Sequence, residues 1–153
     1  MNKTLDETKG YESKLVIENA AGQGTNVGIK FEEIRHIIDH IYDKKRVGVC
    51  IDTQHAWASG YDWRNDFDQI WDDFESIVGM EYLVALHLND SKSDLGSRVD
   101  RHDNIGMGKL GKETFKSFMQ EKRLEDLAGY LETPGGPEMW KPEIAVLRKL
   151  AEK

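Results

Sequence analysis

The chain is organised around two runs near its middle, Leu86-His87-Leu88-Asn89-Asp90-Ser91-Lys92 and Gly96-Ser97-Arg98-Val99-Asp100-Arg101-His102-Asp103-Asn104-Ile105-Gly106. The first run places His87 at the end of an apolar segment, and an Asp100-x-His102 pair follows in the second. Histidine and aspartate are common ligands of divalent metal ions. One short segment therefore carries three candidate metal ligands.

His87 closes the apolar run 82–86, which is typical of a buried strand, and the same arrangement recurs along the chain. The apolar patterns predict strands at 14–17, 47–51, 82–86 and 127–131, and helices at about 30–42, 67–78 and 112–120. A last helix follows the turn at 135–137 and carries Trp140, Ile144, Leu147 and Leu150. The segments 53–60 and 88–106 are expected to be loops. Four strand–helix units in series imply an α/β fold with a parallel sheet and helices packed outside it.

Each predicted strand ends in a polar residue that can bind metal: Glu18, Asp52, His87 and Glu132, in chain order. Successive members of this series are 34, 35 and 45 residues apart, and the long third loop accounts for the last, larger spacing. The carboxyl ends of parallel strands meet at one edge of a sheet, and ligands of α/β proteins bind there. We therefore expect a functional site at this edge.

The full set of candidate ligands is Glu18, Asp52, His55, His87, Asp100, His102 and Glu132. Carboxylate and imidazole ligands without cysteine suit zinc, manganese or iron, more often in catalytic than in structural sites. Seven ligands exceed what one ion with an open position needs, so two or more ions that share a carboxylate are expected. Such clusters activate water and stabilise the attacking and leaving oxygens in phosphoryl transfer.

Each candidate also has a structural interpretation. Glu18 or Asp52 could cap the loop that follows its strand, His87 could be a hydrogen-bonded core histidine, and Asp100 and His102 could belong to an exposed turn. The repetition at four consecutive strand ends favours a metal site over these separate explanations. In contrast, His36 and His40 lie on a helix outside the sheet, where a solvated surface is expected.

Two further segments carry weaker signals. The glycine-rich loop 22–28 lacks the spacing of dinucleotide- and phosphate-binding loops, so we interpret it as a tight turn between strand and helix. Trp57, Tyr61 and Trp63 could stack on a base or sugar, but packing is the more common role for three aromatic residues in a loop.

Composition limits the protein class. A length of 153 residues suits one domain, here residues 14–153, after a polar lead-in at 1–13 that is either a short helix or disordered. A net charge of −7 argues against DNA binding by bulk electrostatics, although bound cations would reverse the local field. No apolar run reaches the roughly 20 residues of a membrane span, and the start lacks the pattern of a signal peptide. The single cysteine, Cys50, fits a reducing compartment, so a cytoplasmic location and no membrane partner are expected.

Several motifs together resemble the endonuclease IV family of abasic-site endonucleases. The matching segments are Glu18-Asn19-x-Ala21-Gly22-Gln23-Gly24, Gly48-Val49-Cys50-Ile51-Asp52-Thr53-x-His55-Ala56, Gly60-Tyr61-Asp62, the two runs that open this section, Asn104-Ile105-Gly106-x-Gly108 and Leu131-Glu132-Thr133-Pro134. The resemblance extends from about Lys14 to the C-terminus.

This resemblance implies a TIM barrel with three zinc ions that cleaves DNA 5′ to an abasic site, leaving a 3′-hydroxyl and a 5′-deoxyribose phosphate. It also implies roles for individual residues. Glu18 would bridge the first and second zinc ions, and Asp52, His87 and Glu132 would complete the second site. His55, Asp100 and His102 would hold the third ion. Glu132 and Glu18 would be catalytic, with Glu132 against the attacking water.

The chain also departs from the family pattern. A complete member has eight strand–helix units, whereas this chain has about four, so it corresponds to the C-terminal half of such a barrel. The absent half would supply two histidines of the first zinc site and the residues that wedge into DNA. Two zinc sites are therefore expected to be complete and a third partial, with manganese as an alternative ion. Gln54 replaces the usual cysteine and Ala20 the usual threonine, neither of them a ligand position.

A half barrel leaves two sheet edges and one sheet face without partners. We therefore expect self-association, association with the absent half in trans, or a fragment that is unstable in isolation. The leading functional interpretation is an abasic-site endonuclease that acts on DNA. The alternatives are a metal-dependent sugar isomerase or epimerase, whose barrels resemble this family, and a catalytically impaired module that binds metal or DNA. The motifs assign no residue to DNA contact.

Overall fold

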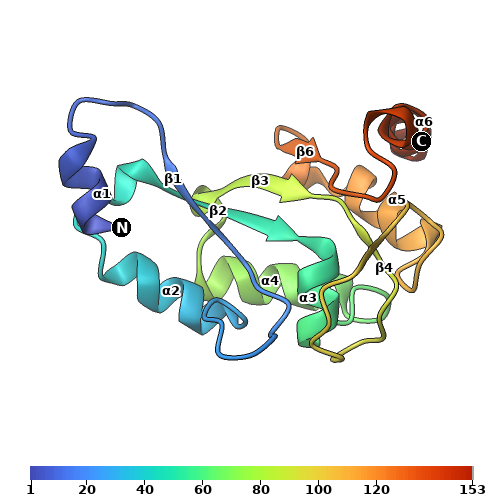
Figure 1. Ribbon diagram of the computed structural model, residues 1–153, viewed down its shortest axis with the longest axis horizontal. Helices are drawn as coiled ribbons and strands as arrows, with labels where there is room; N and C mark the ends of the chain where they lie inside the picture. The colour runs from blue at the N-terminus through green and yellow to red at the C-terminus, as the bar shows by residue number, and fades with distance from the viewer. Residues whose placement is uncertain (153) are drawn as a thin grey trace.

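A computed structural model describes residues 1–152, so Lys153 at the end of the predicted domain lies outside the described residues (Figure 1). Its centre is a sheet of four parallel strands in the order β1 (Leu15–Glu18), β2 (Val47–Asp52), β3 (Leu83–His87) and β6 (Ala128–Tyr130). The predicted parallel α/β sheet is therefore confirmed. Three 3₁₀ turns precede strands β2, β3 and β6, at Lys44–Arg46, Met80–Tyr82 and Lys122–Leu124.

Helices cover one face of this sheet. They are α2 (Phe31–Asp39), α4 (Phe67–Ile77) and α5 (Lys112–Gln120), while α3 (Thr53–Ser59) follows the end of β2 and α6 (Pro137–Ala151) packs against α5. The alternate β2 residues Val47, Val49 and Ile51 are at most 1% exposed on the covered face. Ile34 and Trp71, from the facing sides of α2 and α4, are fully buried in the same core. Burial of such side chains contributes about 1.5–3 kcal/mol each, which holds the helices against the sheet.

The register of the strands brings their carboxyl ends to one edge. Asp52 lies beside His87 across the β2–β3 pair, and Glu18 lies beside Cys50 across the β1–β2 pair. Side chains alternate between the two faces of a strand, so every second residue points away from the helices. The polar residues that end successive strands therefore lie next to one another.

The lead-in forms a short helix, α1 (Asn2–Glu7), which is one of its two expected forms. Leu5 is 2% exposed within the core, and the Asn2 side chain bonds to the carbonyl of His40 and the amide of Tyr42. These contacts fix α1 beside the end of α2. Among the described residues, no helix combines the length and apolarity that crossing a membrane requires.

Two predicted loops are wrong in part. Residues 53–59 form α3, whose N-terminus is capped by the Asp52 carboxylate and which ends at Gly60 with φ 113°. This helix is short and almost wholly buried, so its sequence lacks the polar face that marks an amphipathic helix. The long loop after β3 contains a small antiparallel ribbon, β4 (Asp90–Ser91) paired with β5 (His102–Asp103).

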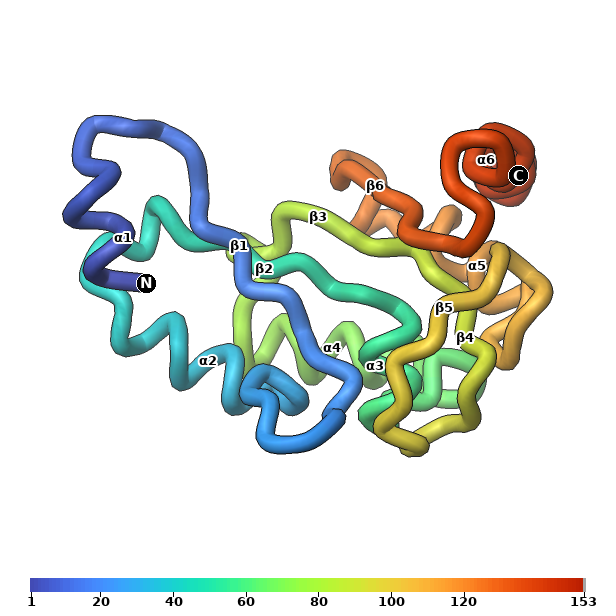
Figure 2. Tube along the Cα trace, viewed as in Figure 1, coloured from blue at the N-terminus to red at the C-terminus, as the bar shows by residue number. Residues whose placement is uncertain are grey.

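The other face and both edges of the sheet are open. Figure 2 shows β1 and β6 at the two sides of the sheet, and within residues 1–152 each has a single strand neighbour. Val16 and Tyr130 are 49% and 55% exposed there. The predicted last helix is α6, and its Ile144 is 41% exposed, because no further unit of the described chain packs beside that helix.

Candidate metal centre

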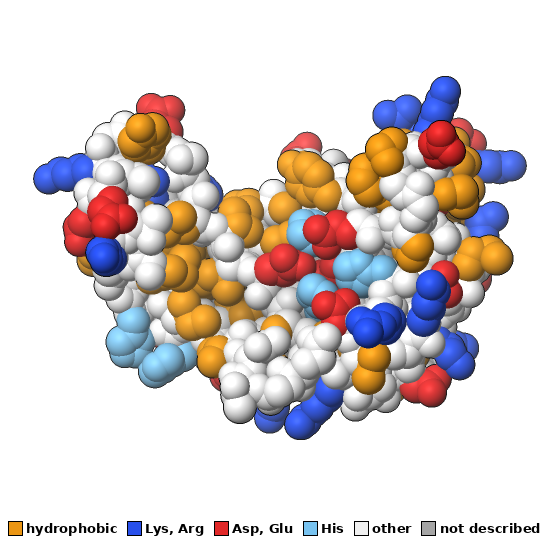
Figure 3. All heavy atoms as spheres, in the orientation of Figure 1, with side chains coloured by type: hydrophobic (Ala, Val, Ile, Leu, Met, Phe, Trp, Pro, Cys, Tyr) orange, Lys and Arg blue, Asp and Glu red, His pale blue; other side chains and the backbone are white. Residues whose placement is uncertain are grey.

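The structure brings all seven predicted ligands together at the carboxyl edge of the sheet. Glu18, Asp52 and His87 are the last residues of β1, β2 and β3, and Glu132 lies two residues after β6. The remaining three come from α3, which carries His55, and from the segment that enters and forms β5, which carries Asp100 and His102. Figure 3 shows acidic and histidine side chains gathered at the centre of the open face.

Four residues form one compact set, the strand-end group: Glu18, Asp52, His87 and Glu132. The Nδ1 atom of His87 lies 3.0 Å from Glu18 Oε1, 3.2 Å from Glu132 Oε2 and 3.8 Å from Asp52 Oδ2. One potential ligand atom from each residue lies within 4.8 Å of all the others. Three carboxylates and one imidazole around a common space suit a divalent ion.

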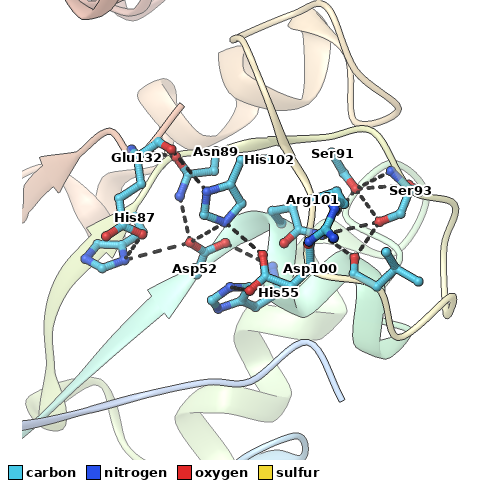
Figure 4. Close-up of polar contacts among 12 residues, drawn as sticks. Asp52, His55, His87, Asn89, Ser91, Ser93, Asp100, Arg101, His102 and Glu132 are labelled. Carbon is cyan, nitrogen blue, oxygen red and sulfur yellow. Dashed lines mark hydrogen bonds and ion pairs between the residues drawn. The ribbon is translucent and has the colours of Figure 1, made fainter. Parts of the chain in front are cut away.

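A second compact set, the ribbon group, consists of Asp52, His55 and His102. Asp100 lies against both histidines, 3.5 Å from His55 Nε2 and 3.5 Å from His102 Nε2 (Figure 4). The resemblance assigned Asp52 to the other site only, whereas the geometry makes it a member of both groups. The seven residues are thus adjacent, while their role as ligands stays a prediction.

The proximity of these groups shifts their pKa values. Burial raises the pKa of Glu18, but hydrogen bonds from His55 and His87 outweigh it and lower that pKa to about 2. Burial lowers the pKa of His55, but Glu18, Asp52 and Asp100 raise it to about 9. Hydrogen bonds with Cys50 and Glu18 outweigh the effect of burial and raise the pKa of His87 to about 11. The acidic groups of the centre therefore stabilise the protonated, positively charged forms of His55 and His87.

Asp52 is the most buried member, with no exposed surface. Burial raises the pKa of its carboxyl, and the nearby charges of His55 and His102 act in the opposite direction. A buried carboxylate requires compensation by positive charge or hydrogen bonds. A divalent ion beside Asp52 would supply that compensation.

The unpaired nitrogen of His102 tests whether the residues fit such an ion. His102 Nε2 is buried and has no hydrogen-bond partner among residues 1–152. It faces Asp52 Oδ2 at 3.6 Å and Asp100 Oδ1 at 3.5 Å. A buried polar atom without a partner is costly, so a cation between these three atoms would satisfy all of them. The donor set fits a divalent metal.

The sequence did not reveal the residues that support these ligands. Asn19 accepts the Asp52 N–H through Oδ1 at 2.6 Å and donates to the Asp52 carbonyl through Nδ2 at 3.2 Å. The Asn19 carbonyl also lies 2.9 Å from His55 Nδ1. A carbonyl at Nδ1 makes that nitrogen the donor and leaves Nε2 for metal. Its position directly after the first strand end is the signal that could have identified Asn19.

Asp90 organises the turn that follows the ribbon. Its buried carboxylate accepts backbone N–H bonds from Ser91, Gly106, Gly108, Leu110 and Gly111. A Cβ on Gly108 would collide with the Ser91 carbonyl, so the glycine permits this close approach. Burial raises the pKa of Asp90, and the N–H bonds oppose that shift.

Glu143, buried on α6, holds the loop beside Glu132. It accepts hydrogen bonds from the Ile105 N–H at 2.7 Å and from the Thr133 hydroxyl at 2.6 Å. The last helix is thereby linked to the segments that carry His102 and Glu132. The helix pattern gives no sign of this role, since Glu143 reads as an ordinary charged residue.

The weaker predictions can also be assessed. His36 on α2 and His40 at its C-terminal cap are exposed, as expected. Trp57 and Trp63 are 5% and 1% exposed and donate to backbone carbonyls, and Tyr61 stacks on Phe31, so packing is confirmed as their role. The loop 22–28 contains a turn with a hydrogen bond from the Asn26 N–H to the Gln23 carbonyl, and a bond from the Ala20 N–H to the Gly28 carbonyl closes the wider loop.

Comparisons with known proteins agree with this geometry. A family model described as "Xylose isomerase-like TIM barrel" matches residues 1–150. Proteins named "Probable endonuclease 4" from Phocaeicola vulgatus and Chlorobium limicola are each 52% identical, over 97% and 90% of this chain and over 52% and 48% of their own lengths. The crystal structure of endonuclease IV from Thermus thermophilus superimposes with a TM-score of 0.85 at 39% identity, covering 98% of this chain and 54% of that one.

The chain thus spans about half the length of the curated relatives that it matches. These matches confirm the resemblance to endonuclease IV and the half-barrel fold. From the four-stranded parallel sheet and the match over residues 1–150, the chain belongs to the xylose isomerase-like TIM-barrel family.

Proposed function

We propose that this chain provides the metal centre of a DNA repair phosphodiesterase that cleaves the backbone 5′ to abasic sites. The observation that carries the proposal is the pair of ligand groups that share Asp52 at the strand ends. Paired metal sites with a common carboxylate suit phosphoryl transfer. Relatives that are 52% identical and named as endonucleases support this reaction class.

We propose zinc as the ion, with manganese as the alternative. The strand-end group would hold one ion and the ribbon group, with Asp100, a second. Glu18 would also contribute to a third site that this chain completes only in part. When bound, such ions supply Lewis acidity and activate water near neutral pH.

In this proposal, Glu132 accepts the proton of the attacking water. Its side chain is 49% exposed and one carboxylate oxygen lies 3.2 Å from His87 Nδ1, so it faces both the group and solvent. In the proposed hydrolysis, water forms a bond to phosphorus, and Glu132 accepts its proton. The bond from phosphorus to O3′ breaks, and O3′ takes a proton, giving a 3′-hydroxyl and a 5′-deoxyribose phosphate.

Glu18 is the second catalytic residue in this proposal. It is 37% exposed and lies on the β1 side of the centre, 3.0 Å from His87 and 3.3 Å from His55. Its strongly lowered pKa keeps it a carboxylate across the physiological range, so it can bridge two cations. The cations in turn would attract the phosphates that a net charge of −7 otherwise repels.

Activity requires closure of the barrel in this proposal. The open strands β1 and β6 and the exposed Val16, Tyr130 and Ile144 leave the centre without walls on two sides. We propose that either a second copy of the chain or a polypeptide equivalent to the other half of the relatives supplies them. The reduced, buried Cys50 is consistent with a cytoplasmic setting.

The test is incision of a duplex oligonucleotide that carries one abasic site, by the zinc-loaded chain alone and with the other half of a relative. Glu132→Gln should reduce the rate by about 10²–10⁴-fold, as expected for loss of a general base. Glu138→Gln makes the same change of charge at an exposed position of α6 and should incise normally. If the Glu132→Gln chain incises at the native rate, the proposed role of Glu132 is wrong.

A sugar isomerase or epimerase is the second candidate, because the matching family is described as xylose isomerase-like. Interconversion of an aldose and a ketose by the metal-loaded chain, without incision, would favour it. Metal uptake with neither activity in the closed assembly would instead favour a binding module that has lost catalysis.

A further inference from the structure

Asn89 joins two predicted ligands that come from different strands. It lies two residues after β3, is fully buried and sits between the ends of β2 and β6. Its Nδ2 donates to Asp52 Oδ2 at 2.7 Å, and its Oδ1 accepts the N–H of Glu132 at 2.8 Å (Figure 4). One side-chain amide therefore sets the position of Glu132 relative to Asp52.

The orientation of this amide is fixed by its partners. The backbone N–H of Glu132 can only donate, so the Asn89 atom that faces it must be Oδ1, and Nδ2 is left as the donor to Asp52. The Thr53 hydroxyl holds the Asn89 backbone, donating to its carbonyl at 2.7 Å and accepting its N–H at 2.9 Å. Every polar group of Asn89 is thus used.

The contact determines how Asp52 faces the two ligand groups. Asp52 Oδ1 accepts the His55 N–H at 2.9 Å, and Oδ2 accepts the Asn89 amide. Oδ2 lies 3.8 Å from His87 of the strand-end group and 3.6 Å from His102 of the ribbon group. A carboxylate oxygen has two acceptor sites, so each oxygen keeps one for an ion.

We propose that Asn89 is a positioning residue that holds Asp52 as the ligand shared by both groups. This inference rests on the proposed divalent-metal centre. A neutral donor orients the carboxylate without cancelling its charge. An aspartate at position 89 would set an oxygen against Asp52, and an alanine would leave a buried acceptor and a buried donor without partners.

The experiment is a titration of the chain with Co²⁺, followed by visible absorption, which reports coordination and needs no catalytic activity. The native chain should take up two ions. Asn89→Ala should bind the second ion roughly 10–100-fold more weakly and change the absorption bands, as is usual when support of a metal ligand is lost. Thr114→Val is the matched control, because it removes another buried hydrogen bond, from the hydroxyl of Thr114 on α5 to the Leu110 carbonyl, and should behave as native.

Circular dichroism identifies folded variants. A folded Asn89→Ala chain that binds both ions with native affinity and spectrum would overturn the proposal. If that variant does not fold, Asn89→Asp keeps the volume and the acceptor for Glu132 but lacks the donor to Asp52. Equal or tighter binding by Asn89→Asp would overturn the proposal as well. If the native chain takes up no Co²⁺, the metal centre of the proposed function is wrong as well. If the native chain binds Co²⁺ and the Asn89 variants bind it equally well, only the role of Asn89 is wrong.

Discussion

The carboxyl edge of the sheet and its open face differ in how completely this chain provides their contacts, namely hydrogen bonds for polar groups and cover for apolar ones. At the edge, Asp52, Asn19 and Asn89 form buried hydrogen bonds that fix the ligand groups. On the open face, Val16 and Tyr130 are about half exposed, and within residues 1–152 β6 has a strand neighbour on one side only. The groups of the site are therefore held by this chain, whereas the proposed function assigns the enclosure around it to another polypeptide. Metal binding and catalysis should accordingly be separable.

The largest expected effect is at the residue that both ligand groups share. Asp52→Asn keeps the shape and the acceptor for the His55 N–H, but it removes the negative charge that two ions require. We expect affinity for both ions to fall at least roughly 100-fold, because loss of a direct ligand should exceed loss of its support. Isothermal titration with Zn²⁺ measures this.

The control for that change is Asp68→Asn, which alters the same charge at an exposed position of α4. It should leave both affinities within about twofold of native. Retention of one native-affinity ion in Asp52→Asn would show that the two groups do not share this ligand.

The pH dependence of stability should separate the metal-free and metal-loaded states. Folding raises the pKa of His55 to about 9 and that of His87 to about 11, above their ordinary value near 6.5. Their contribution to stability is complete below about pH 6.5 and is lost as pH rises through 9 and then 11. Glu18, with its pKa lowered to about 2, contributes above about pH 4.5 and loses that contribution toward pH 2.

Urea unfolding with a chelator should therefore show a lower midpoint at pH 9 than at pH 6. Zinc binding releases the histidine protons, so zinc affinity should instead rise over the same range. A metal-free midpoint that is constant from pH 6 to 9 would contradict the ion pairs between these histidines and Glu18.

A smaller effect should distinguish the two ligand groups from each other. Gly108→Ala places a methyl group against the Ser91 carbonyl and the Asp90 carboxylate. Overpacking of this kind costs about 1–3 kcal/mol of unfolding free energy. Because Ser91 pairs with His102 across the ribbon, the ion in the ribbon group should be weakened more than the ion in the strand-end group.

Stepwise Co²⁺ titration measures the two affinities separately. Gly60→Ala offers a comparison, since Gly60 has φ 113° at the end of α3 and an added Cβ meets no atom within 4 Å. Gly60→Ala should lower the unfolding free energy without changing the affinity for one ion more than for the other. An equal loss of affinity for both ions in Gly108→Ala would mean that the ribbon does not control the affinity of the ribbon group for its ion.

Much of this arrangement follows from the sequence, because strand ends are marked by local patterns. The apolar run before His87 predicts β3, and parallel strands necessarily bring Glu18, Asp52 and His87 to one edge. The sequence does not show α3 or the ribbon, because both are stabilised by tertiary contacts, such as those of Gln54 with Ser93 and Val99, rather than by periodic apolar residues. The roles of Asn89 and Glu143 depend on partners tens of residues away, so no local pattern could identify them.

The smallest expected effect on the isolated chain concerns the open side. Ile144 on α6 is 41% exposed and lines a groove of about 740 Å³ with Trp140 and Arg148. Ile144→Lys should change the unfolding free energy by less than about 0.5 kcal/mol, as surface substitutions usually do, and leave metal affinity within twofold.

If the groove is covered when the barrel closes, the same change should weaken association at least tenfold, measured by analytical ultracentrifugation of the chain alone and mixed with the other half of a relative. Native association in the Ile144→Lys chain would place the closing contacts elsewhere, at the β1 and β6 edges. Loss of metal binding would instead contradict the independence of the two regions.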